Sequence, residues 1–367
     1  MKIFVFGSSI VSSYWNGAAT YYRGIYKYLA RRGHQITFAE PDAYGRQQHR
    51  DHDDFAYIES VVYRPTTDLD RLLQCASDAD IMIKHSGVGV DDELLETLVA
   101  DLAAQTPSVF WDVDSPATIA RLRANRDDPF RSAIPKYDAV FSYGGGPRSQ
   151  DGYLSFGARA YYCIYNGLDS DTHYPVPADA ALACDVAFLG NRLPDREARV
   201  DELFFKAAEL APEMSFLLGG EGWSDKSMPF NVRWIGHVPT GDHNRVNCSA
   251  SMVMNINRAS MASVGFSPPT RVFEVAGAGT CMLCDDWPGI DDCFEPEKEI
   301  VVIRNAHDVV DALRTYDESD RRRIGQAFRS RALRDHTYAQ RAAQAEAAMS
   351  ECIARRSSAP LAVESHA

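Results

Sequence analysis

Short apolar runs alternate with helical patterns along nearly the whole chain, and this alternation limits the fold more than any other feature of the sequence. Buried strands that alternate with helices are typical of parallel βαβ units. The sequence therefore predicts an α/β protein whose strands form parallel sheets.

The two halves of the chain show the same arrangement. In the first half, strands are expected at 2–6, 35–40, 80–84, 108–112, 139–143 and 160–166, and helices at 18–31, 67–76, 91–103 and 116–124. In the second half, strands are expected at 184–190, 214–220, 232–236, 250–256, 280–285 and 299–303, and helices at 195–211, 240–248, 269–278, 307–315, 318–332 and about 337–355.

A segment rich in Pro, Gly and Asp, YNGLDSDTHYPVPADA, separates the halves and is typical of an interdomain connection. A chain of 367 residues is long enough for two domains, each with its own core. We expect a first domain at 1–170, a second at 171–335, a helix at 336–355 that packs back toward the first domain, and a disordered tail at 356–367.

The charge and the apolar runs exclude several classes of protein. The net charge of −13 argues against a nucleic-acid partner, because phosphate backbones need a basic surface. No apolar run approaches the roughly 20 residues of a membrane span, and the start MKIFVFGSS is too short for a signal peptide. We therefore expect a cytoplasmic protein whose eight cysteines are reduced thiols.

The stretch GFSPPTRVFEVAGAGTCMLCDD, residues 265–286, predicts a loop, a helix and a buried strand in succession. Ser267 can cap the helix, and one of the two prolines that follow suits its first turn. The free N–H groups at such a helix start form an anion site, to which Thr270 and Arg271 add donors.

Glu274 falls about one turn into this helix, on the same face as Thr270 and Arg271. A carboxylate there can accept two ribose hydroxyls while the helix start holds phosphates, and together these groups describe one nucleotide. The alternative is a surface ion pair between Arg271 and Glu274 that binds nothing. The strand-loop-helix context favours the nucleotide, because open sheets bind ligands beyond the carboxyl ends of their strands.

The block NINRASMASVGFSPPTRVFEVAGAGTCMLCDDWPGIDDCFEPEKEIVVI resembles the donor-binding half of the CgeB-like, spore-maturation-type glycosyltransferases, relatives of family 4 within the GT-B fold. Shorter stretches extend the resemblance over most of the chain: RGHQITFAE, YNGLDSDTHYPV, FLGNRLPDREARVDEL and VRWIGHVP. The resemblance implies two Rossmann-like domains facing across a cleft, with a nucleotide-sugar on the C-terminal domain and the acceptor on the N-terminal domain.

The resemblance also implies roles for individual residues. Glu274 would bind the donor ribose, and Arg192 and Arg196 would contact the diphosphate. The loop of Gly236, His237 and Val238 would contact the base.

This sequence departs from the family-4 pattern at one position. Those enzymes usually carry a second Glu eight positions before the ribose-binding one, and here that position is Phe266. The donor-hexose contact and the stereochemical outcome are therefore open. Asn257, Arg258 and Ser267 are the polar candidates that remain in this loop.

Asp112-Val113-Asp114 follows a predicted buried strand and has three interpretations. In another glycosyltransferase fold a D-x-D motif holds a divalent metal, but GT-B enzymes usually do without one. In the structural interpretation, Asp114 caps a helix. In the functional interpretation, Asp114 acts as a base for the acceptor or orients it.

His85 directly follows the strand predicted at 80–84 and lies in a loop that would face the cleft. It is either a structural histidine or a contact to the donor sugar or acceptor. The loops YWNGAAT, 14–20, and SYGGGPRSQ, 142–150, are further cleft candidates, the second as a mobile loop that includes Arg148. Cys281 and Cys284 form a C-x-x-C only by letter, because residues three apart on a strand point to opposite faces.

Together these features predict a metal-independent glycosyltransferase that moves a sugar from a nucleoside-diphosphate donor to a hydroxyl or amine of an unknown small-molecule, glycan or protein acceptor. It needs no cofactor beyond the donor. Asp114 and His85 are the candidates for assisting the acceptor. The alternatives are a non-catalytic protein that binds nucleotide-sugars or assists assembly, and a GT-B-type epimerase that acts on the donor itself.

Overall fold

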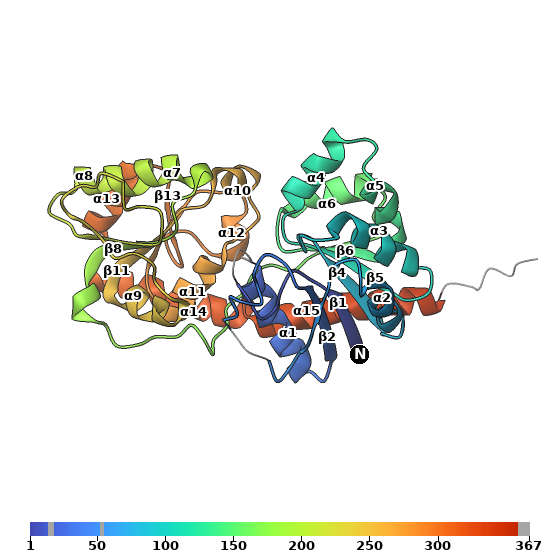
Figure 1. Cartoon of the computed structure of the whole chain (residues 1–367). Helices are drawn as coiled ribbons and strands as arrows, with labels where there is room; N and C mark the ends of the chain where they lie inside the picture. Colours follow the sequence, from blue (N-terminus) through green and yellow to red (C-terminus); the bar gives the residue numbers. More distant parts are fainter. Residues whose placement is uncertain (14–17, 52–54, 359–367) are drawn as a thin grey trace, which may run out of the picture. The chain divides into compact units, whose positions relative to one another are not determined.

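The computed structural model describes residues 1–13, 18–51 and 55–358. The chain divides into two compact units, which are Met1–Tyr165 together with Ala339–Ala367, and Asn166–Tyr338 (Figure 1). Each unit holds one parallel sheet between helices, so the predicted α/β architecture with two parallel sheets is confirmed.

The sheet of the first unit has seven strands in the order β3-β2-β1-β4-β5-β6-β7, and every neighbouring pair is parallel. The strands are β1 Lys2–Phe6, β2 Gln35–Pro41, β3 Glu59–Tyr63, β4 Ile81–His85, β5 Ser108–Asp112, β6 Ala139–Ser142 and β7 Tyr161–Cys163. The helices are α1 Ala19–Arg31, α2 Leu69–Ser77, α3 Asp92–Leu102, α4 Ser115–Ala124, α5 Phe130–Ala133 and α6 Gly146–Ser155, with the 3-10 turn η1 Ile134–Lys136.

Helix α15, Tyr338–Ser358, also belongs to the first unit from Ala339 onward. Glu346 accepts hydrogen bonds from Arg32 at 2.5 Å and from His34 at 3.0 Å. Arg356 donates to Asp138 at 2.7 Å. The helix thus includes the first three residues of the predicted tail, and the other residues of that tail, 359–367, lie outside the described residues.

The second unit repeats this topology with six parallel strands in the order β10-β9-β8-β11-β12-β13. The strands are β8 Cys184–Leu189, β9 Phe216–Gly219, β10 Val232–Trp234, β11 Ala250–Asn255, β12 Met282–Asp285 and β13 Val301–Ile303. The helices are α7 Pro194–Val200, α8 Lys206–Leu210, α9 His243–Ser249, α10 Ala259–Val264, α11 Thr270–Ala278, α12 Ile290–Cys293, α13 Ala306–Thr315 and α14 Glu318–Asp335. A π-helix, Asp201–Phe205, joins α7 to α8, and 3-10 turns lie at Ala180–Leu182 and Thr240–Asp242.

Alternate residues of the second sheet enter two separate cores, one on each face. Helices α7, α8 and α13 lie on one side of this sheet, and α9, α11 and α14 lie on the other (Figure 1). Cys281 lies in the first core and Cys284 in the second, so the two thiols point to opposite faces as predicted. All eight cysteines are free thiols.

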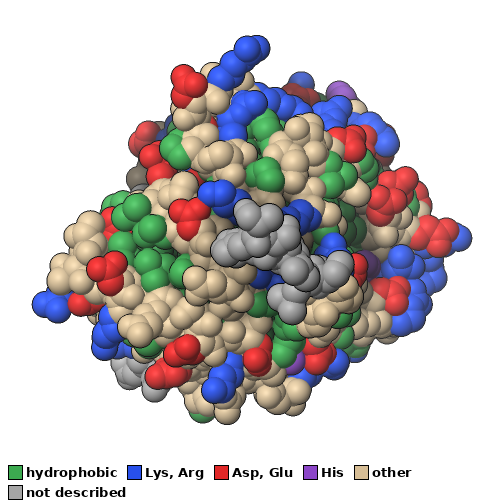
Figure 2. Space-filling model, turned by 90° about the vertical axis from the view of Figure 1, so that its right-hand side faces the viewer, with side chains coloured by type: hydrophobic (Ala, Val, Ile, Leu, Met, Phe, Trp, Pro, Cys, Tyr) green, Lys and Arg blue, Asp and Glu red, His purple; other side chains and the backbone are tan. Residues whose placement is uncertain are grey.

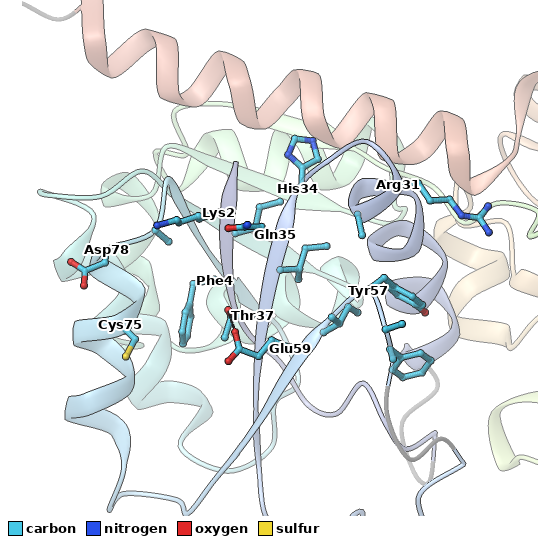
Figure 3. Close-up of a pocket in the computed structure, with 17 residues that line it drawn as sticks. Lys2, Phe4, Arg31, His34, Gln35, Thr37, Tyr57, Glu59, Cys75 and Asp78 are labelled. Carbon is cyan, nitrogen blue, oxygen red and sulfur yellow. Dashed lines mark hydrogen bonds between the residues drawn. The ribbon is translucent and has the colours of Figure 1, made fainter.

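Both sheets reverse their strand order next to the first strand, between β1 and β4 in one unit and between β8 and β11 in the other. In sheets of this kind the carboxyl ends of the strands at the reversal are where ligands bind. A hollow of about 1070 Å³, lined by Lys2, Gln35 and Glu59 among others, lies instead at the amino ends of β1, β2 and β3 (Figure 3). The carboxyl edges are therefore where a ligand site is expected.

The surface carries both signs of charge. Basic and acidic side chains are interspersed over the face shown in Figure 2. In the parts of the chain that the structure covers, every helix is too short or too polar to span a lipid bilayer.

Candidate functional site

The predicted anion helix is present in the second unit as α11. It begins at Thr270, follows Pro269 in the N-cap position and ends at Gly279, whose φ of 76° is left-handed. The predicted helix, 269–278, is therefore confirmed to within one residue. Ser267 does not cap it, because Pro269 holds the cap position and no side chain makes a capping hydrogen bond; Ser267 is buried two residues upstream.

Glu274 lies one turn into α11 and is nearly buried, with 12% of its side chain exposed. Its Oε2 lies 3.3 Å from Nδ1 of His243 and 3.9 Å from Nη2 of Arg271. Burial alone raises the pKa of Glu274, but the hydrogen bond to His243 and the charge of Arg271 outweigh it and lower the pKa to about 2. The carboxylate is therefore charged. Among residues 1–13, 18–51 and 55–358, no group donates a hydrogen bond to its Oε1.

Three arginines gather near the start of α11, and they come from three segments of the chain. Burial, together with the positive charges of Arg271 and Arg258, lowers the pKa of Arg196 to about 10. Burial also lowers the pKa of Arg271. A guanidinium that is destabilised by its neighbours is stabilised when an anion binds between them.

These arginines are only partly paired. Within the described part of the chain, no carboxylate lies at ion-pair distance from Arg196. Nε of Arg196 and Nη1 of Arg271 are buried there without a hydrogen-bond partner. Arg196 donates through Nη2 to the carbonyl of Asn191, and Arg258 pairs with Asp195 at 3.1 Å. Buried donors of this kind normally have partners, so these two N–H groups are available to a ligand.

Arg192, which was also expected at the diphosphate, is placed differently. Its guanidinium pairs with Glu197 at 2.7 Å and Asp225 at 2.8 Å and donates to the carbonyl of Gly222 at 3.3 Å. The structure does not bring it into the arginine cluster, and its contact with the diphosphate stays a prediction.

The expected base loop follows β10, which ends at Trp234. Gly236 has a left-handed φ of 72°, and its carbonyl accepts the N–H of Gly220 at 2.7 Å. His237 is exposed, and the carbonyl of Val238 lies 3.3 Å from Nε2 of His243. His243 therefore lies between this loop and Glu274.

Sequence reasoning missed His243, and it missed His173, whose ring lies 6.5 Å from that of His243 in a nearly parallel orientation. Burial lowers the pKa of His173, and His243 also lowers it while Glu274 opposes the shift. His243 lies 31 residues from Glu274 along the chain, and no spacing or motif links the two.

A third residue that the sequence did not single out is Asp285, at the carboxyl end of β12. It is fully buried and accepts hydrogen bonds from the backbone N–H of Asn257 at 2.9 Å, from Asn255 at 3.0 Å and from Arg199 at 2.7 Å. Burial raises the pKa of Asp285, while the Asn257 N–H and Arg199 oppose the shift. Asp285 thereby fixes the start of the loop that carries Asn257 and Arg258.

Phe266 stands where family-4 enzymes usually have a glutamate, and its ring lies against a neighbouring loop at Gly289. Its φ of 50° is left-handed, and its N–H donates to the carbonyl of Pro288 at 2.7 Å. Its ring lies over Gly289, where an added Cβ would lie 2.4 Å from Cδ1 of Phe266. Gly289 therefore makes room for this ring.

In the first unit, His85 is completely buried at the end of β4. It stacks on Tyr22, with 3.6 Å between ring centroids, and its Nε2 lies 2.6 Å from the hydroxyl of Tyr26. Burial lowers the pKa of His85 well below its usual value, and the charge of Lys84 adds to the shift, so the imidazole is neutral. The ring is enclosed by aromatic side chains, and its role in catalysis stays a prediction.

Asp114 is exposed and occupies the N-cap position of α4, where its carbonyl accepts the N–H of Ala117 at 2.9 Å. Its own N–H donates at 2.8 Å to Asp112, which also accepts the hydroxyl of Tyr153 at 2.5 Å. Within the described ranges, no group of three or more His, Cys, Asp or Glu side chains forms a metal site.

The two glycine loops have different outcomes. Residues 14–17 of the first loop lie outside the described residues. The second was expected to be a mobile loop, and that prediction is wrong from Gly146 onward, where α6 begins with Pro147 in its first turn. Trp223 is buried and donates to the carbonyl of Gly190 at 2.8 Å.

The chain is similar to known proteins in part of its sequence and in its fold. Residues 196–347 match the family model described as glycosyl transferase-like, and no curated protein matches the chain. HepE from Anabaena, solved with UDP and glucose, is 14% identical with a TM-score of 0.68 and covers 96% of this chain and 100% of its own.

Two further solved structures show the same likeness. The catalytic domain of starch synthase IV from Arabidopsis thaliana, bound to ADP and acarbose, is 14% identical with a TM-score of 0.70, covering 96% of this chain and 99% of its own. An α-glucosyltransferase bound to UDP-glucose and DNA is 13% identical with a TM-score of 0.67, covering 95% and 99%. These likenesses confirm the predicted GT-B-type α/β fold.

Proposed function

We propose that this protein is a glycosyltransferase that takes its sugar from a nucleoside-diphosphate donor bound at the carboxyl edge of the second unit. The observation that carries the proposal is the arginine cluster of Arg196, Arg258 and Arg271 at the start of α11, one turn from the charged carboxylate of Glu274. The cluster suits a diphosphate, and the free Oε1 of Glu274 suits a ribose hydroxyl.

The chemistry that these groups supply is electrostatic. When the sugar–phosphate bond breaks, negative charge develops on the leaving diphosphate, and donors already aimed at that position stabilise it without reorganisation. Arg196 and Arg271 have such unpartnered N–H groups, and the free N–H groups of the α11 start lie beside them. No metal ion is needed for this stabilisation, and we propose a metal-independent reaction.

The base of the donor is proposed only as a class. HepE was solved with UDP and starch synthase IV with ADP, so both nucleotides belong in a first screen. The acceptor is an unknown hydroxyl or amine. The structural likeness to an enzyme solved with DNA leaves the exclusion of nucleic acid as a prediction that rests on net charge.

The proposal is tested with a thermal-shift screen of UDP, GDP, dTDP, ADP and their sugar conjugates against the wild type and Glu274→Gln. A ligand at about 100 times its Kd adds roughly 2.7 kcal/mol to the unfolding free energy, which raises Tm visibly. Glu209→Gln, on the exposed face of α8, is the matched control. One nucleotide should shift the wild type and the control but not Glu274→Gln, and equal shifts in all three would refute the site.

The orientation of Phe266 favours one second candidate, a protein that binds the nucleotide-sugar without transferring it. The two functions differ in turnover. The enzyme releases nucleoside diphosphate from its donor, slowly with water and faster with an acceptor, whereas the binding protein does not. An epimerase would instead convert the donor sugar with no acceptor present.

A further inference from the structure

The carboxylate of Asp195 links the first turn of α7 to the start of α10. Its Oδ2 accepts the Nε–H of Arg258 at 3.1 Å and the hydroxyl of Ser260 at 2.5 Å, and its Oδ1 accepts the backbone N–H of Ser260 at 3.3 Å. Ser260 lies in the first turn of α10, and Arg258 is the N-cap residue of that helix. Asp195 therefore satisfies a free N–H of α10 and holds the side chain of its N-cap residue at the same time.

A second carboxylate holds the backbone on the other side of Arg258. Asp285, at the carboxyl end of β12, accepts the N–H of Asn257 at 2.9 Å. The side chain of Arg258 is 50% exposed, and its Nε donates to Asp195. Within the described ranges, neither Nη group of Arg258 donates a hydrogen bond, so both are available to a ligand.

Repulsion between the arginines acts against this arrangement. The positive charges of Arg271 and Arg258 both help to lower the pKa of Arg196, so the guanidinium of Arg196 and that of Arg258 repel each other. An arginine side chain has many rotamers, and a half-exposed one that is repelled by its neighbour can turn toward solvent. The carboxylate of Asp195 opposes this movement while it leaves the Nη groups of Arg258 unoccupied.

We propose that Asp195 is a positioning residue for the diphosphate, because it holds the guanidinium of Arg258 near Arg196 with its Nη groups available to the phosphates. This inference deepens the proposed function and rests on it. Asp195 acts through Arg258 rather than by its own charge, since a carboxylate repels a diphosphate.

The sign of the effect separates positioning from simple charge. If the negative charge of Asp195 acted only by repulsion, Asp195→Asn would bind the diphosphate more tightly. If Asp195 positions Arg258, the variant should bind the diphosphate less tightly. Asparagine has one acceptor oxygen in place of two, so it cannot hold both Arg258 and the N–H of Ser260. The affinity for a nucleoside, which carries no phosphate, should stay the same.

The test is a double-mutant cycle on the full-length protein, with Asp195→Asn, Arg258→Met and the double variant. Calorimetry with UDP, ADP, uridine and adenosine gives the preference for a diphosphate over its nucleoside. Asp195→Asn should lower this preference about three- to tenfold, and Arg258→Met should lower it about tenfold or more. In the Arg258→Met background, Asp195→Asn should change the preference by less than about twofold, because the residue it acts through is gone.

Two further variants serve as controls. Glu202→Gln, in the π-helix that follows α7, removes the carboxylate of another exposed pair, with Lys206 at 3.3 Å, and should leave the preference unchanged. Asp195→Glu keeps two acceptor oxygens and should recover most of the preference. Because the pair with Arg258 is exposed, the Tm of Asp195→Asn should stay close to that of the wild type.

Three results would overturn the positioning role. They are an unchanged or increased preference in Asp195→Asn, an equal loss from Asp195→Asn with and without Arg258, and a large fall in Tm, which would mean that the carboxylate supports the fold. A wild type that binds neither diphosphate more tightly than its nucleoside would instead refute the proposed function.

Discussion

The two sheets have the same strand order, yet their carboxyl edges differ in how their charges are paired. In the first unit, Arg23 forms a bidentate pair with Asp51, and the buried Glu40 accepts hydrogen bonds from the N–H of Ile10 and from Gln47. In the second unit, Nε of Arg196 and Nη1 of Arg271 are buried without partners and the charged carboxylate of Glu274 has a free oxygen. The first unit also has a buried Nε without a partner, on Arg46, but the same side chain donates through Nη1 to the carbonyls of Ser8 and Val88.

Because the two units share their topology, the pairing of charges is the difference that we expect to decide where an anion binds. A paired cation stabilises the fold, whereas an unpaired buried cation costs folding free energy that an anion recovers on binding. We therefore expect an anion at the arginine cluster of the second unit and none at the Arg23–Asp51 pair of the first.

The largest expected effect is on turnover, through Arg196→Met. Removing a donor aimed at the leaving group typically lowers kcat about 10²- to 10³-fold. The measurement is nucleoside diphosphate release from UDP-glucose and ADP-glucose, with water as the acceptor. Because the replaced charge is unpaired, the unfolding free energy of the variant should stay within about 1 kcal/mol of the wild type or rise. A large loss of stability would mean that Arg196 stabilises the fold, contrary to the difference between the two units described above.

The next effect concerns backbone shape at the carboxyl edge of the second unit. Gly220 in the second unit has a φ of 127°, and an added Cβ would lie 2.3 Å from the carbonyl oxygen of Gly190. Gly220→Ala should lower the unfolding free energy by roughly 1–3 kcal/mol. Gly33, with a φ of 89° and open space around it, is the matched control. Chemical denaturation should show the smaller loss for Gly33→Ala; equal losses would mean that the close approach of the two loops is unimportant.

The smallest effect is on a paired cation of the first unit, through Arg23→Ala. The pair with Asp51 is partly exposed, so its loss should cost about 1 kcal/mol and leave UDP and ADP binding unchanged. Burial raises the pKa of Asp51, but Arg23 and Ser13 outweigh it and lower the pKa to about 2. This contribution is therefore full above about pH 4, the unfolded value, and is lost as pH falls toward 2. Denaturation of both proteins at pH 7 and pH 3 should show the difference shrinking; a constant difference would contradict the pairing argument.

Much of the fold follows from the sequence, because buried parallel strands read as continuous apolar runs. The strand Glu59–Tyr63 was missed because ESVVY lies at the sheet edge and is only partly buried. Helix α6 was missed because it opens with glycines and a proline, which also mark turns. The helix predicted at 195–211 is interrupted by the π-helix Asp201–Phe205, a local change that hydrophobic spacing does not reveal.

The site was predictable where neighbours in space are neighbours in sequence. Thr270, Arg271 and Glu274 share one helix, so spacing alone places them together. His243 and Asp285 reach the site through contacts with residues about 30 positions away, and such contacts leave no local pattern.

The measurement that tests the central claim most directly is the affinity of wild type and Arg196→Met for UDP and ADP compared with uridine and adenosine. If the partly paired arginines of the cluster form a diphosphate site, one diphosphate should bind the wild type far more tightly than its nucleoside. Arg196→Met should remove most of that difference, roughly tenfold to a hundredfold, while the nucleoside affinity stays the same. A variant that still distinguishes the diphosphate from the nucleoside as well as the wild type does would contradict the account.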